Sequence, residues 1–115
     1  MRQALILPLL FLPLPASAHA VLMQSTPAPG ARAAPGPVPF NLRYNSRIDV
    51  RRSQLKLLGP DHKELVLPVT AGPTEDTLQT TAQLGPGNYI LRWQVLATDG
   101  HITRGELRFT VTGHE

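Results

Sequence analysis

The chain has 115 residues, a formal net charge of +3, 12 prolines and 9 glycines, and five per cent of its residues are aromatic. A chain of this length forms one small domain and leaves no room for a large enzyme. It contains no cysteine, which excludes disulfides, zinc fingers, iron–sulfur clusters and thiol nucleophiles. A metal would therefore depend on histidine, carboxylate, methionine or backbone groups.

The first 18 residues have the pattern of a secretory signal peptide. A basic start precedes an apolar stretch over residues 4–14, and the small residues Ala16-Ser17-Ala18 form a cleavage site. The apolar stretch is shorter than the roughly 20 residues that a transmembrane helix needs. We expect export and cleavage after Ala18, which leaves a mature domain of residues 19–115. Cleavage after Ala20 also satisfies the small-residue rule.

Short alternating segments predict strands in the first half of the mature chain. Residues 21–25 are the first candidate, and residues 26–39 follow as a stretch rich in Pro, Gly and Ala, which we predict to be a loop. Alternation of apolar and polar residues over 40–44 predicts a strand with one buried face. Residues 53–69 predict a hairpin, and Pro68 within it is typical of an edge strand or a strand end.

The second half carries the clearest strand signal, over residues 89–95, with further alternation over 78–84 and 107–111. The residues expected on the buried faces are Leu78, Thr80, Ala82, Leu84, Tyr89, Leu91, Trp93, Val95, Leu107, Phe109 and Val111. Seven strands in about 100 residues predict an all-β, immunoglobulin-like sandwich.

Two aromatic residues bear on that architecture. Tyr89 follows a Pro-Gly turn and is either the corner tyrosine of such sandwiches or an ordinary core residue. We interpret Trp93, on the same face, as a core residue rather than a platform for a substrate.

Basic residues gather between positions 43 and 56: Arg43, Arg47, Arg51, Arg52 and Lys56. We interpret them as a solvated edge, because a nucleic-acid site would need interleaved aromatic residues or a known binding module. The sequence also lacks a Gly-rich phosphate loop, a Gly-x-Ser-x-Gly motif and a His-Glu-x-x-His motif. We therefore expect no nucleic-acid partner and no enzymatic activity.

The residues that carry chemistry are His19, Asp99 and His101. Cleavage after Ala18 would make His19 the first residue, so that its amine and its imidazole could bind one ion together. Asp99 and His101 flank Gly100 in a loop between strands, where glycine permits a sharp bend. Such a nitrogen-rich set with one oxygen suits Cu(II), ahead of Ni(II) and Zn(II). An ordinary Asp-Gly turn beside an accidental histidine is the alternative.

These residues also resemble the CopC copper-resistance proteins. The resemblance lies in His19-Ala20-Val21-Leu22, Ser25-Thr26-Pro27, the strand from Gly87-Asn88-Tyr89 to Trp93, and Asp99-Gly100-His101 followed by Gly105 and Phe109. It covers nearly all of the mature chain and implies a periplasmic Greek-key sandwich. It also implies that His19, through its amine and ring, binds one Cu(II) ion with Asp99 and His101. We expect a monomer that sequesters copper or delivers it to an inner-membrane copper transport protein.

Two features depart from the family's pattern. Some members have a second, Met-rich site, whereas the mature chain has only Met23, which we interpret as a packing residue, so that one site is expected. The family often places a Glu near the copper after the second strand, and Ser46 stands at that position here. Loss of such a partner can weaken metal binding about 10- to 100-fold. His62 and His114 are expected to be solvent-exposed and outside the site.

Two other functions remain open at this point. Copper monooxygenases also begin with a copper-chelating histidine on a β-sandwich, but they usually present a flat aromatic face. Here five of the six aromatic residues stand at expected core or strand positions, and Asp99 would fill a coordination position that oxygen chemistry needs. The other alternative is a metal-free secreted adhesion or assembly sandwich.

Overall fold

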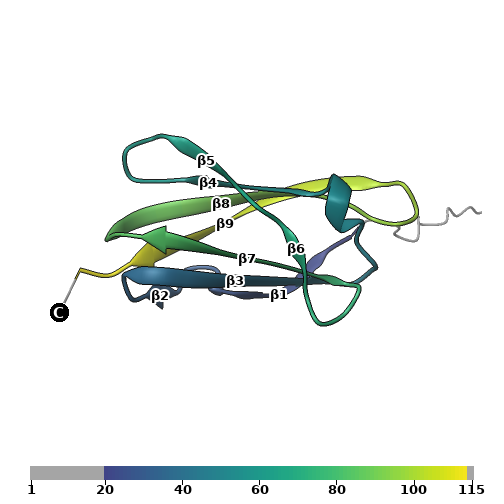
Figure 1. Cartoon of the computed structure of the whole chain (residues 1–115), viewed down its shortest axis with the longest axis horizontal. Coiled ribbons are helices and arrows are strands. Elements are labelled where there is room, and N and C mark those ends of the chain that lie inside the picture. Colours follow the sequence, from purple (N-terminus) through teal and green to yellow (C-terminus); the bar gives the residue numbers. More distant parts are fainter. Residues whose placement is uncertain (1–19, 114–115) are drawn as a thin grey trace, which may run out of the picture.

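The computed structural model describes residues 20–113, so that the expected signal peptide, His19 and His114 lie outside the described residues. A four-stranded sheet of order β1-β3-β7-β6 faces a five-stranded sheet of order β2-β9-β8-β4-β5 (Figure 1). The elements are β1 (Leu22–Thr26), β2 (Arg32–Ala33), β3 (Gly36–Tyr44), the 3₁₀ helix η1 (Val50–Arg52), β4 (Gln54–Leu58), β5 (Glu64–Leu67), β6 (Thr70–Ala71), β7 (Thr77–Leu84), β8 (Gly87–Leu96) and β9 (Ile102–Val111). No helix among these residues is long and apolar enough to cross a membrane.

The predicted all-β sandwich is confirmed, although the described part of the chain has nine strands instead of seven. The two additional strands, β2 and β6, contain two residues each, which is too short for an alternating pattern to show. The predicted hairpin is formed by β4 and β5. β5 is an edge strand that ends at Leu67, directly before Pro68.

The prediction of a loop over residues 26–39 is wrong at residues 32–33, which form β2, and from Gly36 onward, where β3 begins. Pro37 and Pro39 pair with Gln83 and Thr81 of β7. On its other side, β3 pairs with β1 only from Asn41 to Tyr44. The prolines therefore occupy a part of β3 with no strand on that side, where a missing N–H breaks no ladder.

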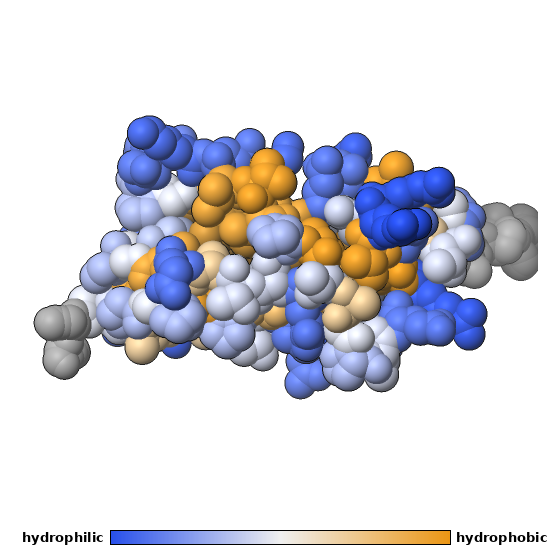
Figure 2. Space-filling model, in the orientation of Figure 1, coloured by the Kyte–Doolittle hydropathy of each residue, from blue (hydrophilic) through white to orange (hydrophobic). Residues whose placement is uncertain are grey.

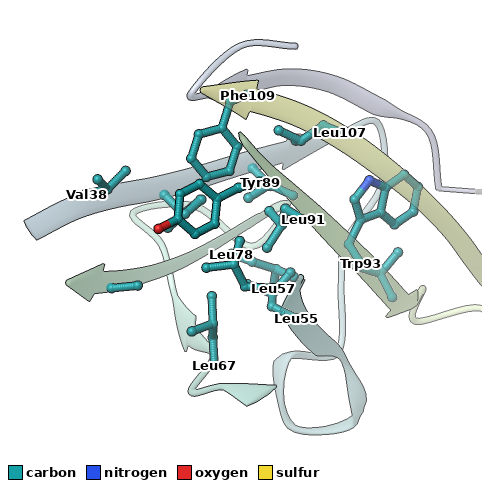
Figure 3. Packing of buried hydrophobic residues seen from close by; sticks show 14 of the residues in the cluster. Val38, Leu55, Leu57, Leu67, Leu78, Tyr89, Leu91, Trp93, Leu107 and Phe109 are labelled. Atoms are coloured by element: carbon teal, nitrogen blue, oxygen red, sulfur yellow. The ribbon is translucent and has the colours of Figure 1, made fainter. Parts of the chain in front are cut away.

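The core consists of the side chains that the two sheets direct toward each other (Figure 3). All eleven residues predicted for the buried faces of the second half are buried. The Tyr89 and Phe109 rings stack at 5.5 Å, and Tyr44 meets Trp93 edge-on at 5.2 Å. The hydroxyl of Tyr89 donates a hydrogen bond of 2.8 Å to the Gly85 carbonyl, which settles its role as a corner tyrosine.

On the face shown in Figure 2, an apolar stripe lies between the β4–β5 hairpin and the β6–β7 side of the sandwich, with polar residues on both sides of it. The exposed large apolar residues of β5 are Leu65 and Val66. Four of the basic residues noted in the sequence, Arg43, Arg47, Arg51 and Arg52, are exposed, as expected for a solvated edge.

A close contact between β8 and β9 gives a test of the packing. Gly105 lies opposite Trp93, and a Cβ atom at Gly105 would be 2.3 Å from Cζ2 of the indole. We expect Gly105→Ala to destabilise the domain by about 1–3 kcal/mol, because the indole or the strand must move. Urea unfolding followed by Trp93 fluorescence measures this. Gly113→Ala, with no atom within 4 Å of the new methyl group, is the control. Equal stability of the two variants would contradict the described packing.

Candidate metal site

The β8–β9 turn carries two of the three residues that the sequence predicts as metal ligands. The N–H of Ala97 donates to the His101 carbonyl and the N–H of Gly100 donates to the Ala97 carbonyl, both at 2.9 Å. These bonds define a three-residue hairpin loop that needs a left-handed residue at its third position. Gly100 fills that position with φ +95°. The glycine of the Asp-Gly-His sequence is therefore explained by the left-handed backbone conformation that this turn requires.

The turn brings Asp99 and His101 together. Oδ1 of Asp99 accepts a hydrogen bond of 3.1 Å from the backbone N–H of His101 and lies 3.3 Å from Nδ1 of its ring. Both side chains are about half exposed. The backbone N–H of His101 is the main cause that lowers the pKa of the Asp99 carboxyl, since it stabilises the ionised form. An imidazole and a carboxylate thus face solvent at one end of the sandwich.

The N-terminal segment enters the described structure at this same end. Ala20 is buried, and its carbonyl accepts a hydrogen bond of 3.0 Å from Oγ1 of Thr103, two residues after His101. The N–H of Val21 donates to Oδ1 of Asn45 at 2.8 Å, and the N–H of Asn45 donates to the Val21 carbonyl at 3.1 Å. Ala20 is therefore held beside β9, the strand that follows His101.

The segment after β3 connects to both sides of this end. On one side, Asn45 of this segment bonds to Val21. On the other side, the N–H of Thr98 in the β8–β9 turn donates a hydrogen bond of 3.1 Å to the Arg47 carbonyl. Ile48 forms an antiparallel bridge with Ala97. Figure 1 shows η1 at the same end of the molecule as the β8–β9 turn, opposite the β4–β5 turn. His62 lies in that opposite turn and is exposed, as expected.

Ser46, which the resemblance noted in the sequence aligns with a Glu of other copper-binding relatives, lies in this segment. It lines a surface hollow with Asn45, Arg47, Thr74, Glu75 and Asp76. Its hydroxyl oxygen is buried and has no hydrogen-bond partner within the described part of the protein. The neighbouring Glu75 carboxylate pairs with the Arg47 guanidinium at 2.9 Å. Ser46 brings no charge to this end of the sandwich.

Residues 20–113 contain no group of three His, Cys, Asp or Glu side chains that could hold a metal ion. The third expected ligand, His19, lies outside the described residues. The interpretation of Met23 as a packing residue is wrong, because 56% of it is exposed. The register of β1 against β3 shifts between Leu22 and Gln24, so Met23 stands in an irregular part of an edge strand and does not pack in the core.

Sequence reasoning missed Asn45 and Thr103. Their hydrogen bonds to Val21 and Ala20 join residues that are 24 and 83 positions apart in the chain. Neither residue belongs to a motif, and no local pattern marks a side chain whose partner is a distant backbone group. Only the closing of the sandwich brings these groups within hydrogen-bonding distance.

Comparison with known proteins agrees with this architecture. The model of the CopC domain matches residues 22–112, and the chain therefore belongs to the CopC family of copper-resistance proteins. The resemblance noted in the sequence is thereby confirmed.

Individual proteins are similar to this chain in sequence or in structure. Protein YobA of Escherichia coli K12 is 29% identical over 98 residues, which cover 82% of this chain and 79% of YobA. The crystal structure of CopC from Methylosinus trichosporium OB3b has a TM-score of 0.77 at 27% identity, covering 84% of this chain and 97% of that one. PcoC of Escherichia coli, described as a methionine-rich copper resistance protein, has a TM-score of 0.67 at 26% identity, with coverages of 83% and 100%.

The hydrogen bond within the turn predicts how Asp99 titrates. In the metal-free protein we expect the Asp99 carboxyl to have a lower pKa than in the unfolded chain. The stability it contributes is then present above the unfolded pKa and is lost as the pH falls through the folded pKa. Carboxyl ¹³C shifts followed against pH, in the folded and the urea-unfolded protein, measure both values. Equal midpoints would contradict the hydrogen bond from His101.

Proposed function

We propose that the mature chain binds one Cu(II) ion through the amine and imidazole of His19, the carboxylate of Asp99 and the imidazole of His101. We further propose that it sequesters this ion in the periplasm or delivers it to an inner-membrane copper transport protein. The observation that carries the proposal is the convergence of Asp99 and His101 on one solvent-facing turn, beside the point where Ala20 is anchored.

The anchoring of Ala20 supports the role of His19. The Ala20 carbonyl accepts a hydrogen bond from Thr103, two residues after His101, so the backbone that directly follows His19 is held close to the β8–β9 turn. Cleavage after Ala18 would give His19 a free amine next to its ring. The resulting three nitrogens and one carboxylate oxygen form the kind of set that Cu(II) accepts in tetragonal geometry.

The cellular role follows from the family and from the N-terminal sequence. Proteins of the CopC family are periplasmic and bind copper. Residues 1–18 match a signal peptide and would direct this chain to that compartment. The delivery step and its membrane partner are proposed from the family resemblance, and we propose that the carrier acts as a monomer.

Several observations favour a binding protein over a copper monooxygenase. Phe40, Tyr44, Tyr89, Trp93 and Phe109 all lie in the core, so these rings do not form the flat aromatic face that such enzymes usually present to polysaccharides. As a ligand of the proposed site, Asp99, whose Oδ1 lies 3.3 Å from Nδ1 of His101, would fill a coordination position that oxygen chemistry needs. The family to which the chain belongs consists of copper-binding resistance proteins.

Native mass spectrometry tests the proposed site directly. The protein is exported with its own N-terminal sequence and then given Cu(II) in the presence of a competing chelator. We expect the measured mass to correspond to a mature chain that begins at His19 and retains one copper ion.

Asp99→Ala and His101→Ala should each weaken binding by at least about tenfold, because each removes a ligand.

His62→Ala is the matched control, because His62 lies in the turn at the other end of the sandwich. It should retain copper like the unaltered protein. A mature chain that begins at Val21, or one that begins at His19 and holds no copper, would overturn the proposed function.

The N-terminal chelate makes a second prediction. One glycine added before His19 moves the free amine away from the imidazole and replaces it with an amide nitrogen, a much poorer donor. We expect a loss of Cu(II) affinity of at least about 100-fold, measured by chelator competition. A glycine added after Glu115 should have no effect. Unchanged affinity in the N-terminally extended protein would show that the amine is not a ligand.

A further inference from the structure

We propose that Asn45 and Thr103 are positioning residues, which hold the N-terminal half of the metal site against the turn that carries Asp99 and His101. This inference rests on the proposed function and concerns the same site. Neither residue is proposed as a ligand. Their role is to place Ala20 and Val21, and through them the amine and ring of His19.

Asn45 holds Val21 at both of its backbone polar groups. Its side-chain oxygen accepts from the Val21 N–H at 2.8 Å, while its own N–H donates to the Val21 carbonyl at 3.1 Å. The ladder between β1 and β3 ends at the pair Leu22 and Tyr44 and is irregular directly after it. The side chain of Asn45 thus continues the pairing one residue beyond the strand, where the edge strand β1 would otherwise fray.

Thr103 makes the corresponding contact on the other sheet. Its hydroxyl donates to the carbonyl of the buried Ala20 at 3.0 Å, and it stands two residues after His101 on β9. This single hydrogen bond joins the residue that follows His19 to the strand that follows His101. It therefore limits the distance between the two halves of the site.

The backbone next to Asn45 completes this arrangement. The Arg47 carbonyl accepts from the N–H of Thr98, and Ile48 bridges to Ala97, so the segment 45–48 contacts the β8–β9 turn as well as Val21. The two halves of the site are thus tied to a common piece of backbone. A terminus ordered before the metal arrives loses less conformational entropy on chelation, which raises affinity without any additional ligand.

The first test measures Cu(II) affinity by chelator competition and copper coordination by electron paramagnetic resonance. We expect Asn45→Ala and Thr103→Val each to lower the affinity about 3- to 10-fold, as for the loss of one or two neutral hydrogen bonds. The spectrum should change from one copper species to a mixture. Thr103→Ser, which keeps the hydroxyl, should restore both the affinity and the single species.

Matched controls separate positioning from general stability. Asn41, on the same strand as Tyr44, accepts a hydrogen bond from the Gln79 side chain, which Asn41→Ala removes. Thr110, on the same strand as Thr103, donates a hydrogen bond to the Asn88 side chain, which Thr110→Val removes. Both lie outside the site and should leave affinity and spectrum unchanged. If they lower affinity as much as the site variants do, the effect is general destabilisation and the inference is overturned.

A double-mutant cycle asks whether Asn45 acts through His19. In the protein with an extra glycine before His19, the N-terminal chelate is already lost, so that Asn45→Ala should cause little further loss of affinity. A full and additive loss would contradict the positioning role. An unaltered protein that binds no copper would overturn the proposed function together with this inference. If the unaltered protein binds copper and the Asn45→Ala and Thr103→Val variants bind it equally well, the inference alone is overturned.

Discussion

The pairing of β8 with β9 is the constraint on which the rest of this molecule depends. Ten residue pairs run without a register shift from Gly87 and Val111 to Leu96 and Ile102. One face of the ladder supplies Tyr89, Leu91, Val95, Leu107 and Phe109 to the core. Its connecting turn carries Asp99 and His101. The interaction that builds the core thus also places Asp99 and His101, the two proposed ligands within the described residues, at one end of the sandwich.

The second half of the site depends on how the chain begins. β1 is short, lies at the edge of its sheet and pairs irregularly with β3. Such a strand would hold a terminus poorly by its ladder alone. The hydrogen bonds of Asn45 and Thr103 to Val21 and Ala20 compensate for this, one from the segment after β3 and the other from β9 of the opposite sheet. In the proposed site, metal binding and the closing of the sandwich are therefore coupled.

The chain belongs to the CopC family, and two of its residues, Met23 and Ser46, distinguish it from some other members. PcoC is described as methionine-rich, whereas residues 19–115 of this chain contain only Met23, exposed on the irregular part of β1. Ser46 lies between Asn45 and Arg47 without a hydrogen-bond partner in the described structure, where a Glu would add a negative charge. Both features support the proposal of a single site that depends on few groups.

Local sequence patterns were sufficient to predict the sandwich, its buried faces and the loop at Asp99-Gly100-His101. The alternation over 78–84, 89–95 and 107–111 and the need for glycine at a left-handed turn position are properties of short segments. The signal peptide and the ligand His19 remain predictions from that same local reading. Only the tertiary structure decided that residues 36–39 join a strand, that Met23 faces solvent, and that Asn45 and Thr103 hold the N-terminal segment. Each of these depends on which strands become neighbours, which no local pattern of residues encodes.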